Sequence, residues 1–258
     1  MYLEVIDSNT PHTPMKKIFY YSYAFLVACT FLAHAQSNIP SPDALQNYYI
    51  GFFKRGEAWT AEQTEEVKNI QAGHLKNLER MFWLGKLLGA GPFLDDSDLR
   101  GVLIFKDDAP DTLRALIAND PAVKAKRLIV NLYPWWGQKN IGKELGDALQ
   151  QDPTMKYEME RYQFVILKQG PKWSPDTTPE LEKLQEEHLA HIMQLLKEKK
   201  ALVAGPFKNK DVFRGILIFK EKSLEDARAI AESDPAVKAG RLQVEIHPWM
   251  CAKGVISE

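Results

Sequence analysis

The chain has 258 residues, of which 45% are hydrophobic and 26% charged, which is an ordinary composition for a globular protein. This length favours two domains of about 100 residues each over a single one. The 33 lysines and arginines nearly balance the 34 aspartates and glutamates, so the net charge gives no reason to expect nucleic acid as a partner.

The first 35 residues differ from the rest of the chain. Two lysines at 16 and 17 precede an apolar run at 18–32 and an A-x-A sequence at 33–35. This order is typical of a secretory signal peptide, with cleavage after Ala35. We therefore expect a periplasmic or secreted protein, with Met1–Pro14 an upstream extension from an early start codon. The apolar run is shorter than the roughly 20 residues of a membrane span, so no span is expected.

Cys29 offers an alternative to free export. Leu26-Val27-Ala28-Cys29 looks like a lipobox, which would make the protein a lipoprotein with a lipid anchor at Cys29. The chain has two cysteines. Cleavage of the signal peptide would leave Cys251 alone, so no internal disulfide is expected.

The sequence contains an internal repeat with a constant shift of 114 residues. A-G-P-F at 90–93 recurs at 204–207, and D-P-A-V-K-A at 120–125 recurs at 234–239. Identical residues at single positions keep the same shift; they include Trp59 and Trp173, His74 and His188, Arg100 and Arg214, and Trp135 and Trp249. Because no gap is needed, the repeat predicts a duplicated folding unit.

The elements of the first copy can be predicted in chain order from periodicity. A β-rich apolar run at 48–53 is followed by polar residues around Trp59 and then by a long helix. The helix is predicted from apolar residues at helical spacing: Val67, Ile70, Leu78, Met81 and Phe82. The remaining elements are a short strand ending in A-G-P-F, a strand at 102–106, a helix at 110–118 and a strand at 128–133.

The second copy repeats this order. Its long helix is predicted from Leu181, Leu184, Ile192, Leu195 and Leu196. We place the first domain at 38–137, a polar linker at 138–159 and the second domain at 160–258. The linker has Gly142, Gly146 and Pro153 as breakers.

The order β-α-β-β-α-β predicts the fold class: two tandem ferredoxin-like domains of the α+β class, each an antiparallel sheet with both helices on one face. The other face of such a sheet is apolar and needs a cover. We therefore expect an intramolecular pseudo-dimer in which the two sheets face each other as a sandwich or a partly closed barrel.

Two histidines within apolar helical stripes are the candidate catalytic residues. His74 and His188 are each flanked at four-residue spacing by apolar positions, so they point inward and need a hydrogen-bonding partner. Asp120 and Asp234 are the candidate partners. A carboxylate on one ring nitrogen leaves the other free to accept a proton, which makes each pair a candidate general base.

Structural interpretations of the same residues remain open. Asp120 and Asp234 each precede a proline, which is the pattern of a helix N-cap followed by proline at the first helical position. A cap and a histidine contact are compatible, since a carboxylate has several acceptor sites. The histidines are equally consistent with satisfied core residues.

The residues together resemble the YCII-related (YciI-like) family in both copies. The resemblance is carried by H-L in the first helix, A-G-P-F, an I-F strand before an acidic helix, D-P-A-V-K-A-G-R and a closing H-P-W. The second copy matches this pattern better, because it has Gly240 and His247 where the first has Lys126 and Tyr133.

The resemblance implies a dimeric α+β barrel fold and an active site made by a His–Asp pair. The positions carried over are His74 with Asp120 and His188 with Asp234. Relatives with this fold include lyases and isomerases that act on small ring compounds. The implied reaction class is therefore proton abstraction with elimination or isomerisation, on a small-molecule substrate.

Arginine and tryptophan pairs are weaker candidates. Arg100 and Arg214 stand before a glycine at the start of a strand and either bind an anionic substrate group or remain solvent-exposed. The tryptophans Trp59, Trp173, Trp135 and Trp249 either line a pocket for a planar ligand or fill the interface between sheets.

No metal-ligand spacing, phosphate-binding glycine loop or nucleophile elbow occurs in the sequence. We therefore expect no metal and no cofactor. Two functions remain: a cofactor-independent small-molecule enzyme, and a non-catalytic ligand-binding or structural module of the cell envelope.

Overall fold

The computed structural model describes residues 45–209, 211–221 and 223–257. The predicted signal peptide and Cys29 lie outside these ranges. Within the described residues, no helix combines the length and the apolar character needed to cross a membrane.

The first half of the described chain, residues 45–138, has the predicted order of elements with one short helix added. These elements are β1 (Leu45–Arg55), α2 (Glu65–Trp83), β2 (Leu87–Pro92), β3 (Leu99–Lys106), α3 (Pro110–Ala118), α4 (Pro121–Lys124) and β4 (Leu128–Gln138).

The second half, residues 159–252, repeats that order. Its elements are β5 (Met159–Gln169), α6 (Pro179–Lys197), β6 (Ala201–Pro206), β7 (Phe213–Phe219), α7 (Leu224–Glu232), α8 (Pro235–Lys238) and β8 (Leu242–Ala252). The two sheets are antiparallel with equivalent strand orders, β2-β3-β1-β4 and β6-β7-β5-β8. This is the ferredoxin-like arrangement that the periodicity predicts.

The long helices begin at side-chain caps. The hydroxyl of Thr64 accepts a hydrogen bond from the backbone N–H of Val67, and Thr178 does the same for Leu181. Acidic residues occupy the first turn of each helix, where their negative charge interacts favourably with the positive end of the helix dipole. The helix face that turns inward carries one buried histidine in each case, His74 or His188.

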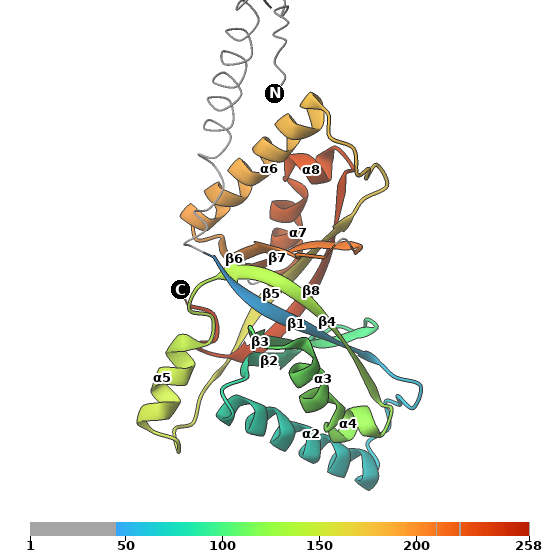
Figure 1. Ribbon diagram of the computed structural model, residues 1–258, viewed down its shortest axis with the longest axis vertical. Coiled ribbons are helices and arrows are strands. Elements are labelled where there is room, and N and C mark those ends of the chain that lie inside the picture. The colour runs from blue at the N-terminus through green and yellow to red at the C-terminus, as the bar shows by residue number, and fades with distance from the viewer. Residues whose placement is uncertain (1–44, 210, 222, 258) are drawn as a thin grey trace, which may run out of the picture. The chain divides into compact units, whose positions relative to one another are not determined.

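The sheets face each other and each is covered by its own helices on the outside (Figure 1). Alternate residues of the central strands enter a shared core, among them Ile50, Phe52, Phe164 and Ile166. The other side chains of these strands pack with the helices in two separate clusters, one for each half. The helix faces that carry His74 and His188 therefore pack on the outer sides of the two sheets.

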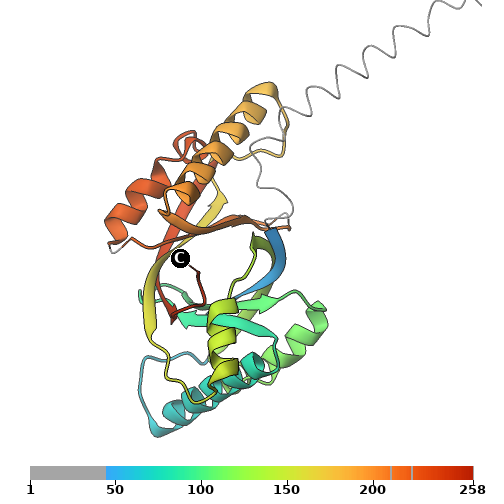
Figure 2. The ribbon, with the colours of Figure 1, turned by 90° about the vertical axis from the view of Figure 1, so that its left-hand side faces the viewer.

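The sheets also meet along their edges. Phe93 bridges to Trp249 and Trp135 bridges to Phe207, so β2 runs beside β8 and β4 beside β6. Glycine makes the close approach possible, because a Cβ at Gly205 would lie 1.7 Å from the carbonyl oxygen of Trp136. Figure 2 shows the strands of both halves around the C-terminal residues of the described chain.

The segment predicted to be a polar linker contains a helix, α5 (Lys143–Gln151). Its Leu145 and Leu149 are buried in the shared core. Burying each leucine stabilises the fold by about 1.5–3 kcal/mol. Two leucines four residues apart are the amphipathic signal for this helix, although Gly142 at its N-cap and Gly146 in its interior argue against one.

Candidate functional site

In the first half, α2 and α4 bring His74 and Asp120 together. The Nδ1 atom of His74 lies 2.8 Å from Oδ2 of Asp120, and Nδ2 of Asn77 donates to the same oxygen at 3.0 Å. The backbone N–H of Ala122 donates to the other carboxylate oxygen at 2.9 Å. Burial raises the pKa of Asp120, but the hydrogen bonds and the charge of His74 outweigh it and hold that pKa below its ordinary value.

The second half repeats the pair with fewer side-chain donors. Nδ1 of His188 lies 2.7 Å from Oδ2 of Asp234, whose other oxygen accepts from the backbone N–H of Ala236 at 2.8 Å. The position of Asn77 is taken by His191. Nε2 of His191 instead lies 3.3 Å from the hydroxyl of Ser233, so Asp234 has one histidine partner.

Both aspartates cap a helix and contact a histidine at the same time. Each is the N-cap of a four-residue helix with proline at its first position, as the sequence pattern predicts. One oxygen serves the cap and the other serves the histidine. The helix cap therefore fixes the carboxylate in the orientation that binds the ring.

The second ring nitrogen decides what each pair can do. An ionised carboxylate only accepts hydrogen bonds, so Nδ1 carries the hydrogen and a neutral ring keeps its lone pair on Nε2. None of the described residues hydrogen-bonds to Nε2 of His74 or His188. Neither atom is among the fully enclosed atoms without a partner, so both keep some accessible surface. Each histidine is 7% exposed, so Nε2 is a nearly buried atom able to accept a proton.

His188 and Asp234 of the second half lie in a segment that matches a known domain family. Residues 163–250 match the YCII-related domain family. The match covers one domain, which includes His188 and Asp234. A search of curated proteins finds no match to this chain.

Solved structures of chlorite dismutase share the fold at low sequence identity. A mutant chlorite dismutase from Candidatus Nitrospira defluvii has a TM-score of 0.50 and 14% identity, with 80% of this chain and 91% of that chain covered. A second mutant of that protein, in complex with cyanide, has a TM-score of 0.50 and 12% identity over 80% and 90% of the two chains. At such identities the likeness shows the α+β fold alone.

The candidate arginines lie at β-bulges rather than in solvent. The β1–β3 pairing passes from Phe53↔Gly101 to Lys54↔Leu99 and leaves Arg100 as the extra residue. The β5–β7 pairing leaves Arg214 in the same way. Bulges redirect side chains, and each of these arginines lies over a tryptophan: Arg100 over Trp59 at 5.0 Å and Arg214 over Trp173 at 4.4 Å from the ring centroid.

The four candidate tryptophans divide into two kinds. Trp135 and Trp249 are 1% and 0% exposed and fill the shared core, which agrees with the packing interpretation. Trp59 and Trp173 are partly buried on the outer, helix-covered sides and pack against the cluster of their own half. The arginine stacks lie on this second kind.

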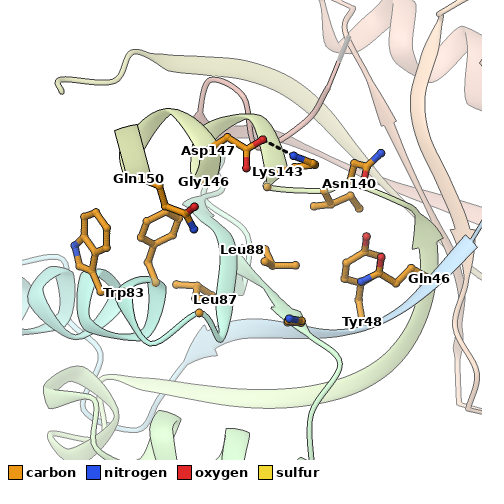
Figure 3. Close-up of a pocket in the computed structure, with 15 residues that line it drawn as sticks. Gln46, Tyr48, Trp83, Leu87, Leu88, Asn140, Lys143, Gly146, Asp147 and Gln150 are labelled. Atoms are coloured by element: carbon orange, nitrogen blue, oxygen red, sulfur yellow. Dashed lines mark hydrogen bonds and ion pairs between the residues drawn. The ribbon is translucent and has the colours of Figure 1, made fainter. Parts of the chain in front are cut away.

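A cavity of about 420 Å³ is shown in Figure 3, and its lining includes no residue of either histidine–aspartate pair. It is lined by Trp83 at the end of α2, by Leu88 of β2, by Gln46 and Tyr48 of β1, and by residues of α5. The Tyr48 hydroxyl donates to the carbonyl oxygen of Gln138 at 2.8 Å, and burial raises its pKa to about 12. This volume is that of a small-molecule pocket.

Sequence reasoning missed a charged network that joins the two halves. His247, in the closing strand of the YCII-related domain, has Nδ1 2.6 Å from Asp95 of the first half and Nε2 3.0 Å from Glu245. Glu245 also accepts from Lys168 at 2.8 Å. Because both ring nitrogens face carboxylates, this arrangement favours the protonated form of His247 and raises its pKa. The H-P-W motif was the available signal, but nothing in the sequence names Asp95 as the partner.

Within the described ranges, no group of three or more histidine, cysteine, aspartate or glutamate side chains is arranged to hold a metal ion. His191 and His247, the histidines found in the second half alone, have separate partners, Ser233 and the two carboxylates.

Proposed function

We propose that this protein is a cofactor-independent small-molecule enzyme of the lyase or isomerase type, in which the His74–Asp120 and His188–Asp234 pairs act as general bases. The observation that carries the proposal is that both rings have a carboxylate on Nδ1 and an Nε2 to which no residue in the described part of the chain hydrogen-bonds. Neither a helix cap nor a satisfied core histidine requires that Nε2 stay free.

In the proposed reaction, Nε2 takes a proton from a carbon next to an electron-withdrawing group of the substrate. The ring becomes an imidazolium, which the aspartate on Nδ1 stabilises. The same Nε2–H then returns the proton at another carbon in an isomerisation, or to a leaving group in an elimination. A positioned base of this kind contributes about 10²–10⁴-fold in rate.

We further propose that the first half is a diverged YCII-related domain, so that one chain carries two copies packed as a dimeric α+β barrel-type pseudo-dimer. The equivalent strand orders, the 114-residue repeat and the edge contacts of Phe93 with Trp249 and Trp135 with Phe207 support this. Export to the periplasm or medium, with a lipid anchor at Cys29 as the alternative, is part of the same proposal.

Proton abstraction can be tested before the natural reaction is known. Small cyclic ketones, lactones and carboxylates are screened by thermal shift, and each stabilising compound is incubated with the protein in D2O. Proton NMR then follows exchange of its acidic C–H. We expect His188→Gln with His74→Gln to slow this exchange by about 10²-fold or more.

His191→Gln is the matched control, because His191 lies on the same helix as His188 and has its own partner in Ser233. It should leave exchange within about twofold of the unaltered protein, an expectation that follows from its absence from the pair. Exchange that persists in the double histidine variant, with its fold intact by circular dichroism, overturns the proposal.

The cavity favours a second candidate, a non-catalytic ligand-binding module. It has the volume of a ligand site, yet neither histidine–aspartate pair lines it. In that case Trp83→Ala should abolish the thermal shift of a bound compound while His188→Gln leaves it unchanged, and no C–H exchange should occur.

A further inference from the structure

Two arginines of the second half are stacked on one tryptophan. The guanidinium carbons of Arg214 and Arg241 lie 4.4 Å and 4.5 Å from the ring centroid of Trp173. Trp173 precedes α6, Arg214 is the bulge residue at the start of β7, and Arg241 comes just before β8. Trp173 packs against the helix-side core, so it is a fixed support that holds both cations in one place.

Neither guanidinium has an anionic partner. Among the described residues, no carboxylate lies within 4.0 Å of Arg214 or Arg241 and no acceptor receives a hydrogen bond from either side chain; Nη1 of Arg241 is fully enclosed without one. Burial and the nearby charge of Arg241 lower the pKa of Arg214. Two cations partly withdrawn from water and unneutralised are unfavourable unless something else compensates them.

The first half provides hydrogen-bond acceptors for the equivalent arginines. Arg100, the counterpart of Arg214, donates to the carbonyl oxygens of Asp95 and Ser97 at 3.0 Å and 3.2 Å, and lies 3.9 Å from the carboxylate of Asp96. Arg127, the counterpart of Arg241, donates to the backbone oxygen of Thr60 at 2.8 Å.

The sequence accounts for the difference between the halves. Asp95 and Asp96 correspond, at the 114-residue shift, to Asn209 and Lys210. The second half therefore keeps the tryptophan and both arginines but lacks the two acidic residues. It has Asp211 in place of Ser97, but this carboxylate accepts a hydrogen bond from Asn209 and forms no ion pair with Arg214 or Arg241. An anion from outside the chain is the partner that this arrangement lacks.

We propose that Arg214 and Arg241, held on Trp173, form a binding site for the oxyanion group of a small molecule, a carboxylate or a phosphate. The planar guanidinium suits both, because its paired N–H groups match two oxygens of either anion. The site does not depend on the general-base proposal, since it needs neither His188 nor Asp234.

Calorimetric titration with sodium benzoate and, separately, with inorganic phosphate tests the site and distinguishes the two anions. We expect saturable binding of at least one of them, weakened at high salt. Arg241→Gln or Arg214→Gln should weaken it by about tenfold or more, because each removes a charge-assisted contact. Arg241→Lys keeps the positive charge but lacks the paired N–H groups of the guanidinium, so it should give an intermediate affinity.

Arg127→Gln is the matched control, because it removes the equivalent arginine from the half whose arginines have hydrogen-bond acceptors within the chain. It should change affinity by less than about twofold, since it removes no contact to the anion. Thermal melting gives an independent readout: the bound anion should raise the Tm of the unaltered protein but not that of Arg241→Gln. Absence of saturable binding of both anions, or equal losses in Arg127→Gln and Arg241→Gln, overturns the proposal.

Discussion

The two halves of the chain share one arrangement of strands and helices but differ in how their polar side chains are paired. In the first half, Asp120 has two side-chain donors and Arg100 has acceptors nearby. In the second half, the described residues provide one side-chain donor for Asp234 and no acceptor for the side chain of Arg214. The arrangement of strands and helices is therefore the same in both halves, whereas the partners of their charged groups differ.

One charged network joins the two halves, and it has no equivalent with the roles of the halves exchanged. His247 of the second half binds Asp95 of the first, while the counterparts of this pair, Tyr133 and Asn209, cannot form an ion pair. The halves are therefore equivalent in topology but not in electrostatics, and matched substitutions in the two halves should have unequal effects.

The largest difference is expected between Asp120→Ala and Asp234→Ala. Each removes a helix cap and leaves a nearly buried histidine without its acceptor, which together cost about 2–4 kcal/mol of unfolding free energy. Asp120→Ala should cost about 1 kcal/mol more, because it also leaves the side-chain amide of Asn77 without its acceptor. Urea unfolding at pH 7 measures both. Equal losses would show that the Asn77 contact contributes nothing to stability.

A pH-dependent difference is expected from His247→Tyr, which copies Tyr133 of the first half. Burial lowers the pKa of His247, but hydrogen bonds and charges of Glu245 and Asp95 outweigh it and raise that pKa above 6.5. A raised histidine pKa gives stability that is present below 6.5 and is lost as the pH rises through the folded value.

Glu245 titrates in the opposite sense. The hydrogen bond from His247 holds the pKa of Glu245 at about 2, so its contribution is present above 4.5 and is lost as the pH falls towards 2. Unfolding free energies between pH 5 and 9 should fall more steeply for the unaltered protein than for His247→Tyr. Parallel curves would mean that the network does not bind a proton on folding.

The smallest difference is expected between Trp135→Phe and Trp249→Phe. Both lose ring volume in the shared core, but Trp135 also donates from Nε1 to the carbonyl oxygen of Gly205 at 2.9 Å, whereas Nε1 of Trp249 is enclosed without a partner. Trp135→Phe should therefore cost about 0.5 kcal/mol more, the low end for one neutral hydrogen bond. Urea midpoints for the two variants, with the dependence on urea unchanged, measure this difference.

Most of the fold could be predicted because the local periodicity of apolar residues indicates the helices and strands. Apolar spacing located the long helices and the central strands, and the constant shift showed that one order of elements occurs twice. Helix α5 was not predicted because Gly142 and Gly146, at its N-cap and in its interior, argue against a helix, and only burial of Leu145 and Leu149 in the shared core offsets their cost.

For the candidate site, the sequence by itself determined that His74 and His188 point inward and that Asp120 and Asp234 cap helices, because both are properties of a single element. Beyond the two predicted histidine–aspartate contacts, only the tertiary structure decided which polar groups meet: Asn77 with Asp120, His247 with Asp95, and Arg214 with Arg241 over Trp173. These contacts join distant segments. Side-chain pairing over such separations depends on how sheets and helices pack, and no spacing along the chain encodes it.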